Sequence, residues 1–216
     1  MEPCRIYIFF KTYKNCESDM CSLKSVCTEY HSCSSKSTTK VIDFDVIKNE
    51  YCKQHAIQPN WKSVDGVCAK KDNSLFLFVE KKSWTQFFLK QKDSSDINIV
   101  DQSLKFGLEE KYEKSVTICE NIIGQGNIFT NDNHAFIFFT DIPSNANPIE
   151  VLNYKLNLLG LTASYVSNEK IIQAQNASKI QMEKVVCSKR FYKFCRNFDK
   201  FINEESVNQT VSSSVV

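Results

Sequence analysis

Two apolar runs of five residues constrain the fold of this chain more than any other feature of its sequence. They occupy 75–79 (Leu-Phe-Leu-Phe-Val) and 135–139 (Ala-Phe-Ile-Phe-Phe). Runs that do not alternate with polar residues are typical of strands covered on both faces, and therefore of the centre of a sheet. We expect strands over 74–82 and 135–140, each buried between layers of helices.

The rest of the pattern places helices before, between and after these strands. Apolar residues at helical spacing predict helices from about 43 to the residue before Pro59, and over 84–91, 101–123, 147–160 and 188–202. Further strands are expected over 4–11, 62–70 and 179–186. The segment 12–40 is polar and rich in cysteine, and it is expected to be an excursion dominated by loops. The fold class is therefore α/β.

Length and composition indicate one domain. The chain has 216 residues, of which 42% are hydrophobic and 24% charged, values that exclude a wholly disordered chain. We expect a single domain over 1–203, a core at about 43–142 and a disordered tail over 204–216. No apolar run reaches the roughly 18–20 residues of a membrane-spanning helix, and the start of the chain lacks a signal-peptide pattern. A cytoplasmic protein with no membrane partner is expected.

One group of charged residues is placed for chemistry. Asp65 stands at the head of the first arm of a predicted hairpin that turns at 71–73, and Glu80 and Lys82 stand at the far end of the second arm. In an antiparallel hairpin these ends lie side by side, and residues two apart on a strand share a face. Two carboxylates and one ammonium group should therefore converge where a buried strand ends.

This group suits metal-assisted cleavage of phosphodiesters. Carboxylate oxygens can hold Mg²⁺ or Mn²⁺ while waters complete its shell, and the metal lowers the pKa of a bound water. Lys82 could orient that water and offset charge on the phosphate. Glu50, on the preceding predicted helix, is a candidate for a further carboxylate. In the alternative interpretation, the charged residues only solubilise a strand end while Asp65 and Gly66 make a turn.

At these positions the chain resembles the PD-(D/E)xK nuclease superfamily. Asp65 matches the first Asp of the motif, and residues 80–82 (Glu-Lys-Lys) match the (D/E)xK triplet, although Val64 stands where the motif has proline. The resemblance implies a restriction-endonuclease-like core over about 43–140, with a mixed central sheet flanked by helices. The cysteine-rich N-terminal excursion and the C-terminal helix would be additions. The segment 93–133 is long for a connection within that core.

The resemblance also implies a function. It predicts a metal-dependent endonuclease that cleaves DNA, with Asp65 and Glu80 as magnesium ligands, Lys82 as the catalytic lysine and Glu50 as an auxiliary carboxylate. By analogy, such a nuclease would serve in a bacterial antiviral-defence or DNA-processing complex, with a partner subunit that activates or recruits it. The net charge of only +2 fits recruitment by a partner. The alternative is a non-enzymatic scaffold subunit with an inactive nuclease-like fold.

A cysteine cluster in the polar excursion is a candidate zinc site. Four thiols in a segment poor in apolar residues could bind Zn²⁺ tetrahedrally, but the spacing contains no C-x-x-C pair, so free thiols are the alternative. The candidate ligands are Cys16, Cys21, Cys27 and Cys33.

Overall fold

A mixed β-sheet forms the centre of the protein in a computed structural model. The structure describes residues 1–20, 23, 37–58, 60–91, 98–130, 132–143, 147–161, 166–192 and 195–204. Its six strands within these residues follow sequence order across the sheet: β1 (Glu17–Asp19), β2 (Lys40–Asp43), β3 (Gly66–Ala69), β4 (Phe76–Lys82), β5 (His134–Thr140) and β6 (Ser188–Tyr192). Strands β1 to β4 pair antiparallel, whereas β5 runs parallel to both β4 and β6. The predicted α/β class with a mixed central sheet is confirmed.

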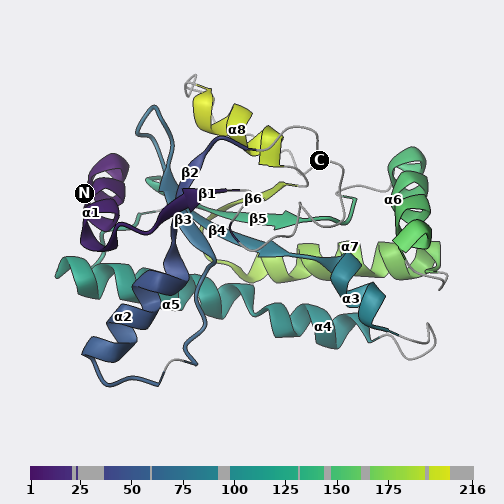
Figure 1. Cartoon of the computed structure of the whole chain (residues 1–216), viewed down its shortest axis with the longest axis horizontal. Helices are drawn as coiled ribbons and strands as arrows, with labels where there is room; N and C mark the ends of the chain where they lie inside the picture. Colours follow the sequence, from purple (N-terminus) through teal and green to yellow (C-terminus); the bar gives the residue numbers. More distant parts are fainter. Residues whose placement is uncertain are drawn as a thin grey trace.

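Helices cover both faces of this sheet (Figure 1). The described helices are α1 (Pro3–Lys14), α2 (Phe44–Gln54), α3 (Trp84–Lys90), α4 (Ile99–Phe106), α5 (Leu108–Ile123), α6 (Pro148–Leu161), α7 (Asn168–Lys184) and α8 (Cys195–Asn203). Helices α4, α5 and α7 lie on one face, called here the α5 face, and α8 lies on the opposite face, called the α8 face.

Alternation along β4 and β5 divides the core between the two faces. Phe76 and Phe78 belong to the large core that contains residues of α4, α5 and α7, whereas Leu77 and Val79 belong to a smaller core with Phe198 of α8. All four side chains are fully buried. The apolar runs are continuous for the predicted reason: each strand packs against a hydrophobic core on both of its faces.

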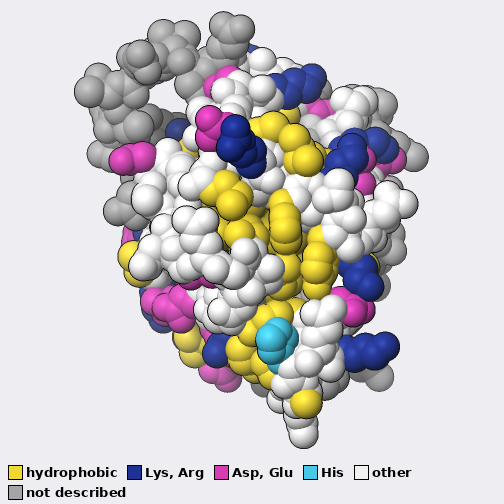
Figure 2. Space-filling model, turned by 90° about the vertical axis from the view of Figure 1, so that its left-hand side faces the viewer, with side chains coloured by type: hydrophobic (Ala, Val, Ile, Leu, Met, Phe, Trp, Pro, Cys, Tyr) yellow, Lys and Arg dark blue, Asp and Glu magenta, His cyan; other side chains and the backbone are white. Residues whose placement is uncertain are grey.

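The predicted strand over 4–11 is wrong, because these residues belong to α1. Ile6 and Phe10 are buried one helical turn apart, while Ile8 is 50% exposed. Pro3 lies in the first turn of the helix, where its missing N–H costs nothing. Figure 2 shows apolar side chains gathered on the face of the molecule that carries this helix.

Three other predicted elements are wrong in part. The predicted strand at 179–186 is largely the last turns of α7, which ends at Lys184. The predicted helix over 188–202 is divided into β6 and α8, so that Phe191 packs on Phe138 and Phe198 on Phe139, on opposite faces of the sheet. The predicted helix over 101–123 is two helices, α4 and α5, which are separated by Gly107.

Two expected features fall mostly outside the described residues. Most of the cysteine-rich excursion lies there, although β1 and the start of β2 lie within the described part of segment 12–40. The predicted tail lies there apart from its first residue. In the described part of the chain, every helix is too short or too polar to cross a membrane.

Candidate active site

The β3–β4 hairpin brings Asp65 and Glu80 together. Asn73, at a φ of 61°, closes the turn by donating its N–H to the carbonyl of Lys70 at 3.0 Å. At the other end of the hairpin Gly66 pairs with Val79, and the N–H of Asp65 donates to the Val79 carbonyl at 3.0 Å. The next cross-strand neighbours are Asp65 and Glu80, as the sequence predicted for this end of the hairpin.

Strand alternation turns Glu80 and Lys82 towards the α5 face, and the Lys82 ammonium contacts the Glu80 carboxylate there. Lys81, between them, points to the other side of the sheet and donates to the Met20 carbonyl at 3.0 Å. The Lys81 backbone N–H donates to Asp65 Oδ2 at 2.8 Å. The middle residue of the triplet therefore orients Asp65 through its backbone, not through its side chain.

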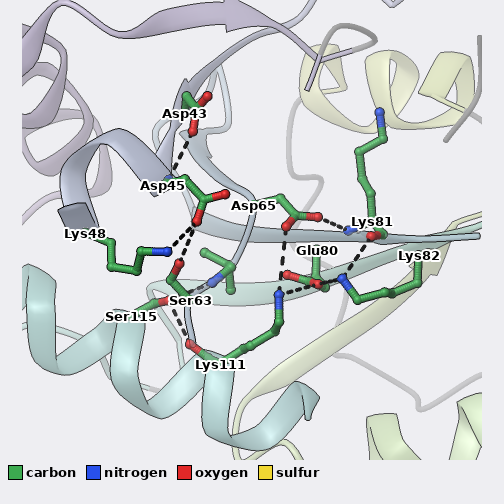
Figure 3. A network of polar contacts seen from close by, with 11 residues as sticks. Asp43, Asp45, Lys48, Ser63, Asp65, Glu80, Lys81, Lys82, Lys111 and Ser115 are labelled. Carbon is green, nitrogen blue, oxygen red and sulfur yellow. Dashed lines mark hydrogen bonds and ion pairs between the residues drawn. The ribbon is translucent and has the colours of Figure 1, made fainter. Parts of the chain in front are cut away.

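A fourth charged residue, Lys111 of α5, completes the cluster (Figure 3). Its Nζ lies 2.7 Å from Glu80 Oε1 and 3.9 Å from Asp65 Oδ1. This residue was not among the site residues predicted from the sequence. A signal was present, since Lys111 follows Leu108 by three residues and precedes Ser115 by four, so it interrupts the buried stripe of the helix. We call Asp65, Glu80, Lys82 and Lys111 the charged cluster.

A buried serine fixes helix α5 to the segment that leads into β3 and carries Asp65. Ser115 Oγ accepts the backbone N–H of Val64 at 2.9 Å and donates to the Lys111 carbonyl at 2.7 Å. The carbonyl of Asp65 in turn accepts the N–H of Phe44, the first residue of α2, at 3.1 Å. These bonds hold the backbones of three elements around the cluster, and a rigid frame of this kind is what a catalytic site requires.

Burial dominates the electrostatics of the cluster. The Asp65 and Glu80 residues are 1% and 0% exposed, and the Lys111 and Lys82 side chains are 12% and 21% exposed. Burial raises the pKa of Glu80, the charge of Asp65 raises it further, and the two ammonium groups oppose these effects. Burial also lowers the pKa of Lys111, against the attraction of the two carboxylates.

Glu50 lies apart from this cluster in the described contacts. Its carboxylate pairs with Lys14 of α1 at 3.1 Å and accepts a bond from Gln54 at 2.9 Å. The ammonium of Lys14 is the main cause of the lowered pKa of Glu50. Another carboxylate of α2, Asp45, accepts from Ser63 at 3.2 Å and so contacts the segment that leads to Asp65 (Figure 3).

The donor atoms fit a magnesium ion held by two protein carboxylates. Glu80 Oε2 is buried and makes no hydrogen bond within the described residues, so an oxygen lone pair is left for a cation. The described residues contain no group of three or more His, Cys, Asp or Glu arranged for a metal. Mg²⁺ often has one or two carboxylate ligands and completes its shell with water, so Asp65 and Glu80 would suffice.

The zinc hypothesis concerns residues that lie mainly outside the described part of the chain. Cys21, Cys27 and Cys33 are among those residues. Cys16 is described as a free thiol that lies 3.6 Å from the Asp43 carbonyl, and burial raises its pKa, which opposes the thiolate form that zinc requires.

Comparison with known proteins adds no relative. No family model matches the chain, and neither a curated protein nor a solved structure is detectably similar to it. The charged cluster and its position in the sheet are therefore the basis for inferring function.

Proposed function

We propose that this protein is a metal-dependent nuclease that cleaves phosphodiester bonds in DNA. The observation that carries the proposal is the meeting of Asp65 and Glu80, from opposite arms of one hairpin, with the ammonium group of Lys82 at the end of a central strand. Paired carboxylates beside a lysine are the groups that phosphodiester hydrolysis with Mg²⁺ requires.

The order of the elements supports a restriction-endonuclease-like core. Helix α2 precedes the β3–β4 hairpin, α3 follows it, and β5 returns parallel to β4, which is the order that the sequence resemblance implies. Helices α4 and α5 lie between α3 and β5 and account for the long connection. In this proposal they are an insertion that adds Lys111 to the site.

Each residue of the cluster has a distinct role in the proposed reaction. Bound Mg²⁺ or Mn²⁺ would polarise the phosphate and lower the pKa of a coordinated water. Asp65 and Glu80 would hold the ion, and the bond from the Lys81 N–H keeps Asp65 turned towards Glu80. Lys82, the more exposed of the two lysine side chains, would orient the attacking water and stabilise negative charge on the phosphate.

The surroundings of the cluster favour a protein that acts with a partner. Both carboxylates are covered, and the net charge of +2 supplies little general attraction for DNA. We infer that a partner subunit recruits or activates the nuclease, in a cytoplasmic antiviral-defence or DNA-processing complex of the kind that the resemblance implies.

Plasmid cleavage with Mg²⁺ or Mn²⁺ tests the proposal. We expect Glu80→Gln and Lys82→Met to reduce the cleavage rate by about 100-fold or more, because each removes a group that acts on the reacting phosphate. Lys105→Met, at an exposed lysine of α4, is the matched control and should cleave like the wild type. Equal cleavage by all four proteins would contradict the proposal, since the activity would then not depend on the cluster.

A second candidate function follows from the charge balance of the cluster. The charges of two carboxylates and two ammonium groups cancel, so the cluster has no net charge without a ligand. This favours a non-enzymatic scaffold in which the cluster only joins α5 to the hairpin. Absence of cleavage by the wild type even when the activating partner is present, together with reduced thermal stability of Lys82→Met, would support the scaffold.

A further inference from the structure

Lys111 occupies the position between the two proposed metal ligands. Its Nζ contacts Glu80 Oε1 at 2.7 Å and approaches Asp65 Oδ1 to 3.9 Å, so one ammonium group bridges both carboxylates. The residue lies on α5, outside the Asp and (D/E)xK positions that the resemblance matched. The cluster therefore has one positive charge more than the motif itself provides.

This extra charge opposes the binding of a divalent cation. With both lysines in place the charges of the cluster cancel, and a divalent ion would leave it with a net charge of +2 in a buried setting. Like charges a few ångströms apart repel strongly where water is excluded. The two oxygens of Glu80 also differ, because Oε1 accepts both ammonium groups while Oε2 has no hydrogen-bond partner among the described residues.

We propose that Lys111 is an internal counter-ion, and that a divalent cation binds Asp65 and Glu80 only when the Lys111 ammonium withdraws from between them. This inference rests on the proposed function for the identity of the metal ligands. The Lys111 side chain is 12% exposed, so solvent already reaches part of it and provides a place for the displaced ammonium. Lys111 is therefore a regulator of metal affinity, distinct from Lys82, which acts on the phosphate.

Calorimetric titration with Mn²⁺ tests the competition directly. We expect the Mn²⁺ affinity of Lys111→Met to be at least about tenfold higher than that of the wild type, because a repelling unit charge has been removed. Lys114→Met is the matched control: it removes the same charge from the same helix at a lysine that stacks on Trp61, and its affinity should equal that of the wild type. Unchanged or weaker binding by Lys111→Met would overturn the inference.

A second measurement uses the wild-type protein and does not depend on the folding of a variant. In the metal-free protein the Lys111 side chain is only 12% exposed and its amine contacts Glu80, so a bulky acetylating reagent should reach it slowly. Saturation with Mn²⁺ should raise the acetylation of Lys111 several-fold, as measured by mass spectrometry of its peptide, and leave that of Lys114 unchanged. Unchanged acetylation of Lys111 at saturating Mn²⁺ would refute displacement.

The outcomes separate this inference from the proposed function. Mn²⁺ binding that is lost in Glu80→Gln but not strengthened in Lys111→Met refutes the counter-ion and leaves the nuclease proposal standing. Tighter binding by Lys111→Met, with no DNA cleavage by any variant even when the activating partner is present, supports the counter-ion and refutes the nuclease. Absence of Mn²⁺ binding in both the wild type and Lys111→Met overturns the inference, since no cation site would exist for Lys111 to occupy.

Discussion

Glu80 is a buried carboxylate in the centre of a sheet, and its ionisation is coupled to folding. Its surroundings include two ammonium groups but also Asp65 and a low-dielectric core, and the net effect of these groups is a raised pKa. The folded protein therefore holds the Glu80 proton to a higher pH than the unfolded chain does. Ionising Glu80 costs more in the folded state, and that cost lowers the free energy of unfolding.

Replacement of Glu80 by glutamine should expose this coupling. Relative to Glu80→Gln, the wild type should lose stability as pH rises above 4.5, the ordinary pKa of glutamate, and the loss should end once the folded pKa has been passed. Urea unfolding of both proteins from about pH 4 to about pH 7 measures the difference. Glu113→Gln, at an exposed glutamate of α5, corrects for a simple change of charge. A wild type that gains stability relative to Glu80→Gln over this window would contradict the raised pKa.

The sequence predicted the part of the site that depends on local pairing. A hairpin with a short turn fixes which residues face each other, so the approach of Asp65 to Glu80 follows from spacing alone. Lys111 reaches the same point from helix α5, 31 residues beyond Glu80 in the chain. Contacts of this kind depend on how α5 packs on the sheet, which no local pattern determines.

At the scale of the elements, Gly107 determines where α5 begins. This residue has a φ of +56° and ends α4 by donating its N–H to the Leu104 carbonyl, while its own carbonyl accepts the N–H of Lys111. The sequence prediction of one helix over 101–123 rested on the apolar spacing within 108–123, and it extended that helix across Gly107. The buried positions shift at this break, from Ser103 and Phe106 in α4 to Leu108 in α5, so the buried stripe of α5 does not extend back through Gly107.

Gly107→Ala should destabilise the protein by about 1–2 kcal/mol, because a side chain disfavours the left-handed conformation. The new Cβ would also lie 3.1 Å from Lys62 Nζ. Gly160→Ala is the control, since Gly160 lies in α6 and, among the described residues beyond its own stretch of helix, no atom lies within 4 Å of its added Cβ, so alanine there should be neutral or stabilising. Chemical denaturation compares the two. Equal stability of both variants would show that the bend at Gly107 imposes no backbone constraint.

At the scale of the whole molecule, the two faces of the sheet have separate roles. The charged cluster lies on the α5 face, whereas α8 covers the other face and closes a smaller core with Phe139 and Leu77. The sequence predicted a sheet covered on both faces but could not assign α8 to its face. That assignment depends on β6, which separates Phe191 from Phe198 and sends them to opposite sides.

Asp199 attaches α8 to the N-terminal half of the chain. Its carboxylate accepts the N–H of Thr38 at 3.0 Å, the hydroxyl of Thr39 at 2.5 Å and the hydroxyl of Ser37. These residues precede β2, so the contact joins segments about 160 positions apart in sequence. Because Ser37 is buried, loss of the carboxylate would leave its hydroxyl without this acceptor.

Asp199→Ala should therefore lower the free energy of unfolding by about 1–3 kcal/mol and accelerate amide hydrogen exchange in α8. Glu204→Gln, which removes an exposed charge that pairs with Lys200, should change stability by less than about 0.5 kcal/mol. Because Asp199 lies on the α8 face, its loss should leave the Mn²⁺ affinity of the charged cluster unchanged. A parallel loss of Mn²⁺ affinity in Asp199→Ala would show instead that the two faces are coupled through the sheet, and that α8 helps to hold Asp65 and Glu80 in register.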